Sequence, residues 1–213
     1  MLYRSHPWHG LSLGSGAPQS VNCYIEIVPT DTVKYELDKE TGILKVDRPQ
    51  KYSSLCPSLY GLLPKTYAGD EVAKYCMQKT GRKGLVGDGD PLDICVLTEK
   101  VIVHGDIIVK AIPIGGFRLL DGNEVDDKLI AVLEDDLVYG EMSDIKDCPH
   151  GFIERLRHYF LTYKDVPKDG SKDASERHSS QVEITHIYGR DEAREIITLG
   201  GLDYQKLISE QGF

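Results

Sequence analysis

Short strand-like runs dominate the first part of this chain, and they constrain its fold more than any other feature. In residues 33–37, for example, apolar side chains fall on one face of a strand, and Lys34 and Glu36 fall on the other. Turns rich in Gly, Pro and Asp separate runs of this kind at 23–28, 33–37, 42–47, 92–98, 106–114 and 128–134. Strands of this length and density predict a small closed or nearly closed β-barrel.

Helical periodicity is confined to the C-terminal part of the chain. Within residues 150–164, four apolar residues spaced i, i+3, i+7 and i+10 share one helical face: Ile153, Leu156, Phe160 and Tyr163. A second helix is expected over 189–199, where Gly200 and Gly201 would end it, and a third over 202–210. The barrel is therefore expected to be accompanied by C-terminal helices.

Two polar stretches, at 67–84 and 165–180, interrupt these elements, and the second predicts an exposed loop. A chain of 213 residues can bury a core without disulfides, and single barrels commonly exceed 200 residues. We expect one domain over residues 1–213 that is mainly β with α-helices (α+β).

The charge balance excludes some classes of protein. Lys and Arg number 25 against 34 Asp and Glu, and the net charge of −9 argues against a nucleic-acid binder. No apolar run approaches the roughly 18 residues of a membrane-spanning helix, and the N-terminus lacks the apolar stretch of a secretory signal. Five cysteines with no C-x-x-C pair predict reduced thiols in a cytoplasmic protein.

The densest chemical signal is a group of carboxylates in residues 87–93. Asp88, Asp90 and Asp93 fall within six residues of one turn, and a strand-like run follows. Asp121 and Asp126 form a second acidic group near Lys128, after the strand-like run at 106–114. Carboxylates this close raise one another's pKa values unless a cation neutralises them, and all-oxygen ligands suit Mg²⁺, Mn²⁺ or Ca²⁺. If both acidic groups meet in space, their carboxylates could together bind a cluster of metal ions.

Other interpretations of the acidic turn are weaker. An isolated D-G-D turn is usually an acidic surface turn. A calcium loop starting at Asp88 would have Leu92 where an oxygen ligand is needed and Asp93 where glycine is needed. Cys148 and His150 resemble half of a zinc site that has no second half. The sequence contains no P-loop, no G-x-S-x-G and no H-E-x-x-H motif.

Cationic and phenolic side chains accompany the acidic groups along the chain. Arginine offers a bidentate fork to phosphate, lysine a mobile point charge and tyrosine a neutral donor. Each such residue alone would be ordinary, but the set suits a highly charged phosphate compound: Lys34, Arg48, Tyr60, Tyr163 and Lys164.

Several motifs occur together in a fixed order: Ile25-Glu26-Ile27, residues 33–42, Val46-Asp47-Arg48, residues 57–61, Asp88-Gly89-Asp90-Pro91-Leu92-Asp93, Pro113-Ile114-Gly115, Asp121 with Asp126 and Lys128, His158-Tyr159-Phe160 and Tyr163-Lys164-Asp165. In this order the chain resembles the soluble, magnesium-dependent inorganic pyrophosphatases of family I. The matches cover roughly residues 23–165, and their combination is highly specific.

The resemblance implies a five-stranded OB-like closed barrel with helices packed outside it. It also implies hydrolysis of pyrophosphate to two phosphates by direct in-line attack of a metal-activated water, without a covalent intermediate. The implied cofactor is Mg²⁺, with Mn²⁺ or Zn²⁺ as substitutes, and a homo-oligomer is expected. The implied roles are general base for Asp90, metal binding for Asp88, Asp93, Asp121 and Asp126, phosphate binding for Lys34, Arg48, Tyr60, Tyr163 and Lys164, and lining of the site for Glu26, Glu36 and Lys128.

The chain departs from the family pattern in three places. Gly122 replaces a glutamate that often follows the position of Asp121, and residues 66–86 resemble an insertion. The usual basic tail with its tryptophan is absent after Lys164, so a further phosphate-binding lysine would be Lys168 or Lys172. Two other functions remain open at this point, a non-catalytic nucleic-acid-binding OB module and a phosphatase acting on nucleotides.

Overall fold

The computed structural model describes residues 4–51, 53–164 and 182–211. The loop expected at 165–180 and the alternative lysines Lys168 and Lys172 therefore lie outside the described residues. Among the described helices, none is long and apolar enough to cross a membrane. All five cysteines are buried, and none is bonded to another.

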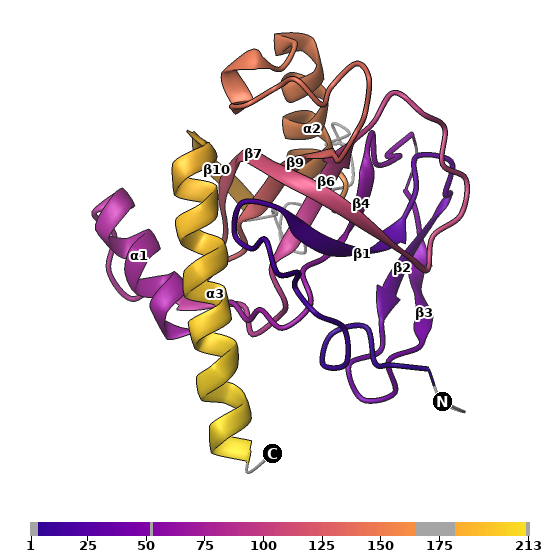
Figure 1. Cartoon of the computed structure of the whole chain (residues 1–213). Coiled ribbons are helices and arrows are strands. Elements are labelled where there is room, and N and C mark those ends of the chain that lie inside the picture. The colour runs from indigo at the N-terminus through magenta and orange to yellow at the C-terminus, as the bar shows by residue number, and fades with distance from the viewer. Residues whose placement is uncertain (1–3, 52, 165–181, 212–213) are drawn as a thin grey trace, which may run out of the picture.

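A closed ring of five strands forms the centre of the molecule (Figure 1). In ring order the strands are β1 (Val21–Ile27), β4 (Leu59–Leu62), β6 (Asp93–Leu97), β9 (Lys128–Leu133) and β7 (Ile107–Asp121), and β7 pairs back with β1. Every neighbouring pair is antiparallel except β6 and β9, which run parallel. The predicted five-stranded, OB-like barrel is confirmed.

The other strands lie outside this ring. The hairpin of β2 (Val33–Leu37) and β3 (Leu44–Pro49) forms a separate two-stranded sheet. The two-residue strands β5 (Val86–Gly87) and β8 (Glu124–Val125) pair with each other, and β8 also pairs with the end of β7. A last strand, β10 (Val182–Gly189), lies antiparallel to β7.

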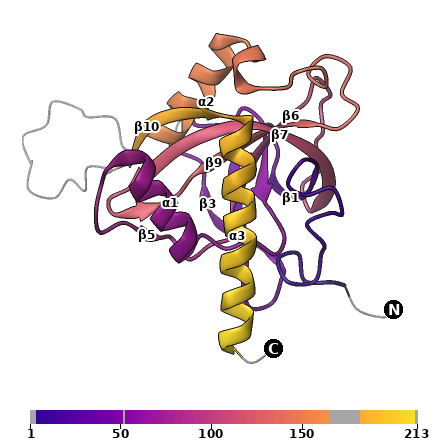
Figure 2. The same cartoon turned by 60° about the vertical axis from the view of Figure 1, so that its left-hand side comes forward.

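Helices cover the ring on two sides, as the two views in Figures 1 and 2 show. They are α1 (Asp70–Thr80), α2 (His150–Thr162) and α3 (Arg190–Gln211), and a 3₁₀ turn, η1 (Ile145–Asp147), precedes α2. One apolar core joins the barrel strands to α1 and α3, and a second joins them to α2. The apolar face predicted for α2 is confirmed, because Ile153, Leu156 and Phe160 are buried in this second core.

The structure corrects the C-terminal part of the prediction. The helix expected to end at Gly200 and Gly201 continues through both residues, so the regions 189–199 and 202–210 form the single helix α3. A side chain at position 200 would meet Leu92 Cδ1 at 2.5 Å, and the Gly200 carbonyl accepts a 2.9 Å hydrogen bond from the Tyr67 amide. Gly200 therefore allows α3 to pack closely against the segment beside the acidic turn instead of ending the helix.

The elements that were not expected from the sequence are β4, β10, α1 and the short elements β5, β8 and η1. Tyr60 lies within β4, and α1 lies inside the polar stretch 67–84. The N-terminus of α1 is capped from a distant part of the chain, because Asp203 on α3 accepts hydrogen bonds from the amides of Gly69, Glu71 and Val72 at 3.0–3.2 Å.

Replacing Asp203 with alanine is expected to lower the free energy of unfolding by about 1–2 kcal/mol. The side chain is 3% exposed, and its loss leaves the first amides of α1 without their acceptor. Urea unfolding followed by circular dichroism measures the change. Glu195→Ala, an exposed position on the same helix, is the control and is expected to change stability by less than about 0.5 kcal/mol. Equal midpoints for wild type and Asp203→Ala would contradict the capping role.

Candidate active site

Two parallel strand pairings bring the two acidic segments together. In the β5–β8 pair Gly87 lies opposite Val125, so the chain leaves both strands side by side at Asp88 and Asp126. In the β6–β9 pair Asp93 lies opposite Lys128. The acidic segments are separated by about thirty residues in sequence, and the ladder places them next to each other.

The acidic turn at residues 88–93 is held from behind by the chain before α1. Ala68 donates its amide to the Asp90 carbonyl at 2.8 Å, and Gly89 donates to the Ala68 carbonyl at 3.2 Å. A Cβ atom at Gly87 would lie 2.0 Å from the Ala68 oxygen, and Gly89 has a φ of +79°. The two glycines thus permit a close approach and a left-handed turn that other residues would resist. The result is a rigid turn that presents its aspartates on one side.

Lysines neutralise these aspartates in the structure. Lys128 is almost fully buried, and its ammonium donates to both Asp93 and Asp126. Lys39 pairs with Asp90. Lys164 Nζ lies 2.6 Å from Asp121 Oδ2. Within the described ranges, no three acidic, histidine or cysteine side chains converge in a metal-binding arrangement.

The charged form of three nearby carboxyl groups is nevertheless disfavoured. Burial, followed by repulsion from Asp126, raises the pKa of Asp88 to about 8. Burial also raises the pKa of Asp126, and Asp93 adds to the increase. Burial and the Asp93 charge together raise the pKa of Glu26 to about 8. Carboxyl groups in this state gain stability from a nearby divalent cation, and an all-oxygen set fits Mg²⁺ or Mn²⁺.

Lys34 and Arg48 come from the β2–β3 hairpin, where they lie opposite each other. Lys34 Nζ is 3.0 Å from both Glu36 Oε2 and Asp47 Oδ2, and Arg48 Nη1 is 3.1 Å from Asp47 Oδ2. Burial disfavours the charge on Lys34, but its two acidic partners outweigh that effect and raise its pKa. Lys34 and Arg48 are thus held next to each other on the hairpin.

The remaining predicted phosphate ligands come from the barrel and from the end of α2. Tyr60 projects from β4, and burial followed by the Asp93 charge raises its pKa well above the usual value. Tyr163 and Lys164 follow α2 directly. The Arg48 guanidinium lies 5.8 Å from the centre of the Tyr163 ring, and Lys164 Nζ lies 5.7 Å from it. The barrel, the hairpin and α2 thus converge on one place.

All five predicted phosphate ligands line one cavity of about 270 Å³, together with Asp90, Asp93 and Asp126. Six acidic and five basic side chains line it in total. Asp88 lies beside Asp126, and Asp121 reaches the cavity through its ion pair with Lys164. A mixed-charge cavity of this size suits a compact polyanion bound together with cations.

Sequence reasoning assigned no role to Lys39, although it lines the cavity and pairs with Asp90. Lys39 follows β2, in the turn that leads to β3. The only signal was its position in the motif at 33–42, where it falls two residues beyond the strand that carries Lys34.

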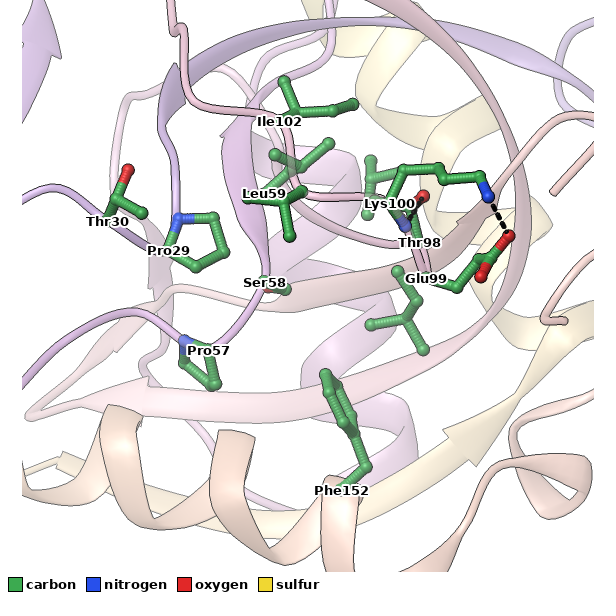
Figure 3. A pocket seen from close by; sticks show the side chains of 13 residues that line it. Pro29, Thr30, Pro57, Ser58, Leu59, Thr98, Glu99, Lys100, Ile102 and Phe152 are labelled. Atoms are coloured by element: carbon green, nitrogen blue, oxygen red, sulfur yellow. Dashed lines mark hydrogen bonds and ion pairs between the residues drawn. The ribbon is translucent and has the colours of Figure 1, made fainter.

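A second cavity, of about 190 Å³, lies away from the acidic turn (Figure 3). Apolar side chains such as Pro29, Leu59 and Phe152 form most of its wall, and the ion pair between Lys100 Nζ and Glu99 Oε1, at 2.7 Å, lies among its lining residues. It shares no lining residue with the mixed-charge cavity. We therefore place the candidate active site in the larger cavity.

Comparison with known proteins identifies the family of the chain. Residues 23–204 match the family model described as inorganic pyrophosphatase. The chain is 56% identical over 203 residues to an inorganic pyrophosphatase of Chlamydia muridarum, covering 95% of each chain, and 40% identical over 160 residues to a soluble inorganic pyrophosphatase of Oryza sativa subsp. indica, covering 75% of this chain and 66% of that one.

Solved structures resemble the fold over almost its full length. The inorganic pyrophosphatase of Thermus thermophilus matches with a TM-score of 0.74 and 26% identity, covering 94% of this chain and 99% of that one. The enzyme of Helicobacter pylori matches with a TM-score of 0.72 and 29% identity, covering 92% and 98%.

Proposed function

The chain belongs to the family of inorganic pyrophosphatases, hydrolases that act on pyrophosphate, and we propose that its mixed-charge cavity performs this hydrolysis with Mg²⁺ as the working ion. The observation that supports this site most directly is the convergence of two acidic segments with five cationic or phenolic side chains on one cavity. Pyrophosphate is a polyanion, so a net-acidic protein must neutralise some of its own carboxylates to bind it.

Asp88, Asp93, Asp121 and Asp126 are the proposed metal ligands. Their donor set is entirely carboxylate oxygen, which suits Mg²⁺ and admits Mn²⁺ or Zn²⁺ as substitutes. A bound divalent cation supplies positive charge for phosphate oxygens and a water of lowered pKa. Lys128 and Lys164 pair with three of these carboxylates in the structure. If a metal ion neutralised the carboxylates instead, both ammonium groups would become available to the phosphate groups.

Asp90 is the proposed general base. Its side chain is 44% exposed and lines the cavity, so a water in the cavity can reach it. The Lys39 ammonium pairs with this carboxylate. Asp90 thus takes the proton of the water that attacks one phosphorus in line.

Lys34, Arg48, Tyr60, Tyr163 and Lys164 are the proposed phosphate ligands. They stabilise the charge that develops on the leaving phosphate. Among the described residues that line the cavity, none is Ser, Cys or His. This composition supports direct attack by water over a covalent intermediate.

The test is phosphate release from pyrophosphate and from ATP, each with Mg²⁺ and with EDTA. We expect rapid release from pyrophosphate with Mg²⁺, much slower release from ATP, and loss of activity in EDTA that added Mg²⁺ restores. Full activity in EDTA would reject the metal-dependent mechanism. Preference for ATP would instead identify a nucleotide phosphatase.

We also propose that the chain forms one domain and works in the cytoplasm as a homo-oligomer. Five buried, unpaired cysteines support a reducing compartment. Large apolar side chains such as Val101 and Leu137 are more than 80% exposed and are available for subunit contacts. Light scattering on the purified protein measures the assembly.

A further inference from the structure

Arg118, a fully buried residue on β7, forms an ion pair with Asp127, the residue between two that line the cavity. Its Nε lies 3.0 Å and 2.9 Å from the two carboxylate oxygens of Asp127, whose side chain is 1% exposed. Its Nη2 donates to Glu192 Oε1 on α3 at 3.0 Å. Arg118 therefore links the barrel, the segment before β9 and the C-terminal helix.

Aromatic rings enclose the same guanidinium. Its central carbon lies 5.5 Å from the ring centre of Tyr75 on α1 and 5.2 Å from that of Tyr188 on β10. Both distances lie within the range of cation–π attraction. The Arg118 side chain is thus fixed by groups from four other parts of the fold.

Stability alone does not explain this ion pair. Taking both charges out of water costs several kcal/mol for each ion, and well-packed apolar residues are often equally stable in such positions. A fully buried pair, in which the Arg118 Nε donates to both oxygens of one carboxylate, instead offers a fixed position for the chain segment that carries it. Outer-shell partners of metal ligands commonly have this function.

The segment held by Arg118 carries the acidic site. Asp127 stands between Asp126 and Lys128, which both line the cavity. In extended backbone successive side chains point to opposite sides, so Asp127 turns away from the cavity and toward Arg118. The Asp126 amide also donates to the Leu119 carbonyl, next to Arg118, at 3.0 Å.

We propose that Arg118 is a positioning residue that acts through Asp127 to hold Asp126 and Lys128 in their metal-binding and substrate-binding arrangement. This inference rests on the proposed function, because it takes Asp126 as a metal ligand. Glu192 on α3 pairs with the same guanidinium through Nη2.

The experiment measures Mg²⁺ affinity by calorimetry without pyrophosphate. The double variant Arg118→Met/Asp127→Leu removes the ion pair without leaving a single buried charge, and Glu192 keeps Lys79 as a partner at 3.3 Å. We expect the double variant to fold and to bind Mg²⁺ about 10- to 100-fold more weakly than wild type. An affinity within threefold of wild type would overturn the proposal.

Two further variants complete the test. Arg118→Lys keeps the charge but loses the planar fork, and it decides the question if the double variant does not fold. We expect it to weaken Mg²⁺ binding as well, so unchanged affinity in a folded Arg118→Lys protein overturns the proposal.

Asp136→Asn is the control, because Asp136 is a buried acceptor whose hydrogen-bond partners are Thr98 and the backbone amides of residues 99, 138 and 139. It is expected to lower stability without changing Mg²⁺ affinity, and an equal loss of affinity there would attribute the effect to general destabilisation.

Asp126→Asn separates this inference from the proposed function. If wild type binds Mg²⁺ and Asp126→Asn does not, the metal site stands, and the Arg118 variants test positioning alone. If Asp126→Asn binds Mg²⁺ as tightly as wild type, the metal assignment fails, and the positioning proposal fails with it.

Discussion

Asp90→Asn is expected to lower kcat for pyrophosphate about 10²- to 10⁴-fold while leaving Mg²⁺ affinity within a few-fold of wild type. Asparagine keeps the size of the side chain but cannot accept the proton of the attacking water, and general-base catalysis contributes an effect of that order. Asp90 is not one of the four proposed metal ligands, so its replacement should spare the metal site. Steady-state phosphate release and calorimetric Mg²⁺ binding measure the two effects separately.

Lys39→Met is the matched control for Asp90→Asn. It removes the ion pair to Asp90 but leaves the carboxylate in place. We expect a decrease in kcat of less than about tenfold, because an exposed pair contributes little. If Asp90→Asn has a wild-type rate and pH profile, another group is the base. If both variants lose activity equally, the ion pair and not the base accounts for the loss.

Asp93→Asn is expected to lower kcat/KM at least ~10²-fold and to weaken Mg²⁺ binding at the same time. The substitution preserves volume but removes one ligand charge, and the loss of a single preorganised electrostatic contact has an effect of this scale. The combined loss of affinity and rate distinguishes a metal ligand from a base. Phosphate release measured over a Mg²⁺ titration shows whether a higher Mg²⁺ concentration restores part of the rate.

The Asp93 prediction has its own control. Asp191→Asn makes the same chemical change on a side chain that is 93% exposed at the start of α3. It is expected to leave both rate and affinity unchanged. Normal turnover by Asp93→Asn, with the control also normal, would show that Asp93 is not a ligand.

Local patterns predicted much of the fold. The strand-like runs at β1, β2, β3, β6, β7 and β9, together with the apolar face of α2, each carry their own signal over five or more residues. By contrast, β4 has only four residues, and a Cβ atom at Gly61 would lie 1.9 Å from the Tyr24 oxygen. β4 is a strand because it pairs closely with β1, and the residues of β4 alone carry no signal of that pairing.

Helix α1 and the continuity of α3 depend on contacts between distant residues. The cap of α1 is Asp203, more than 130 residues away in sequence, and only Val72, Ala73 and Cys76 of α1 are buried. Glycine commonly follows the end of a helix, but Gly200 lies within α3, where its lack of a side chain allows close contact with Leu92. Sequence reasoning cannot assign either feature without knowing the tertiary contact.

The residues of the candidate site were predictable, but their partners were not. Spacing and family resemblance named the aspartates and the phosphate ligands, and the parallel pairing of β5 with β8 and of β6 with β9 brings their segments together. The pairing of Lys39 with Asp90 and of Arg118 with Asp127 depends on the folded chain alone. The catalytic and metal-binding roles of the site residues remain predictions, which the experiments described above would test.

Helix α3 contacts the supports of both acidic segments without lining the cavity itself. Through Gly200 it contacts the chain that supports the turn at 88–93, and through Glu192 it contacts the Arg118–Asp127 pair. Loosening of this one helix is therefore expected to weaken the support of both acidic segments at the same time. A substitution that disturbs α3 would consequently affect the cavity without touching any residue that lines it.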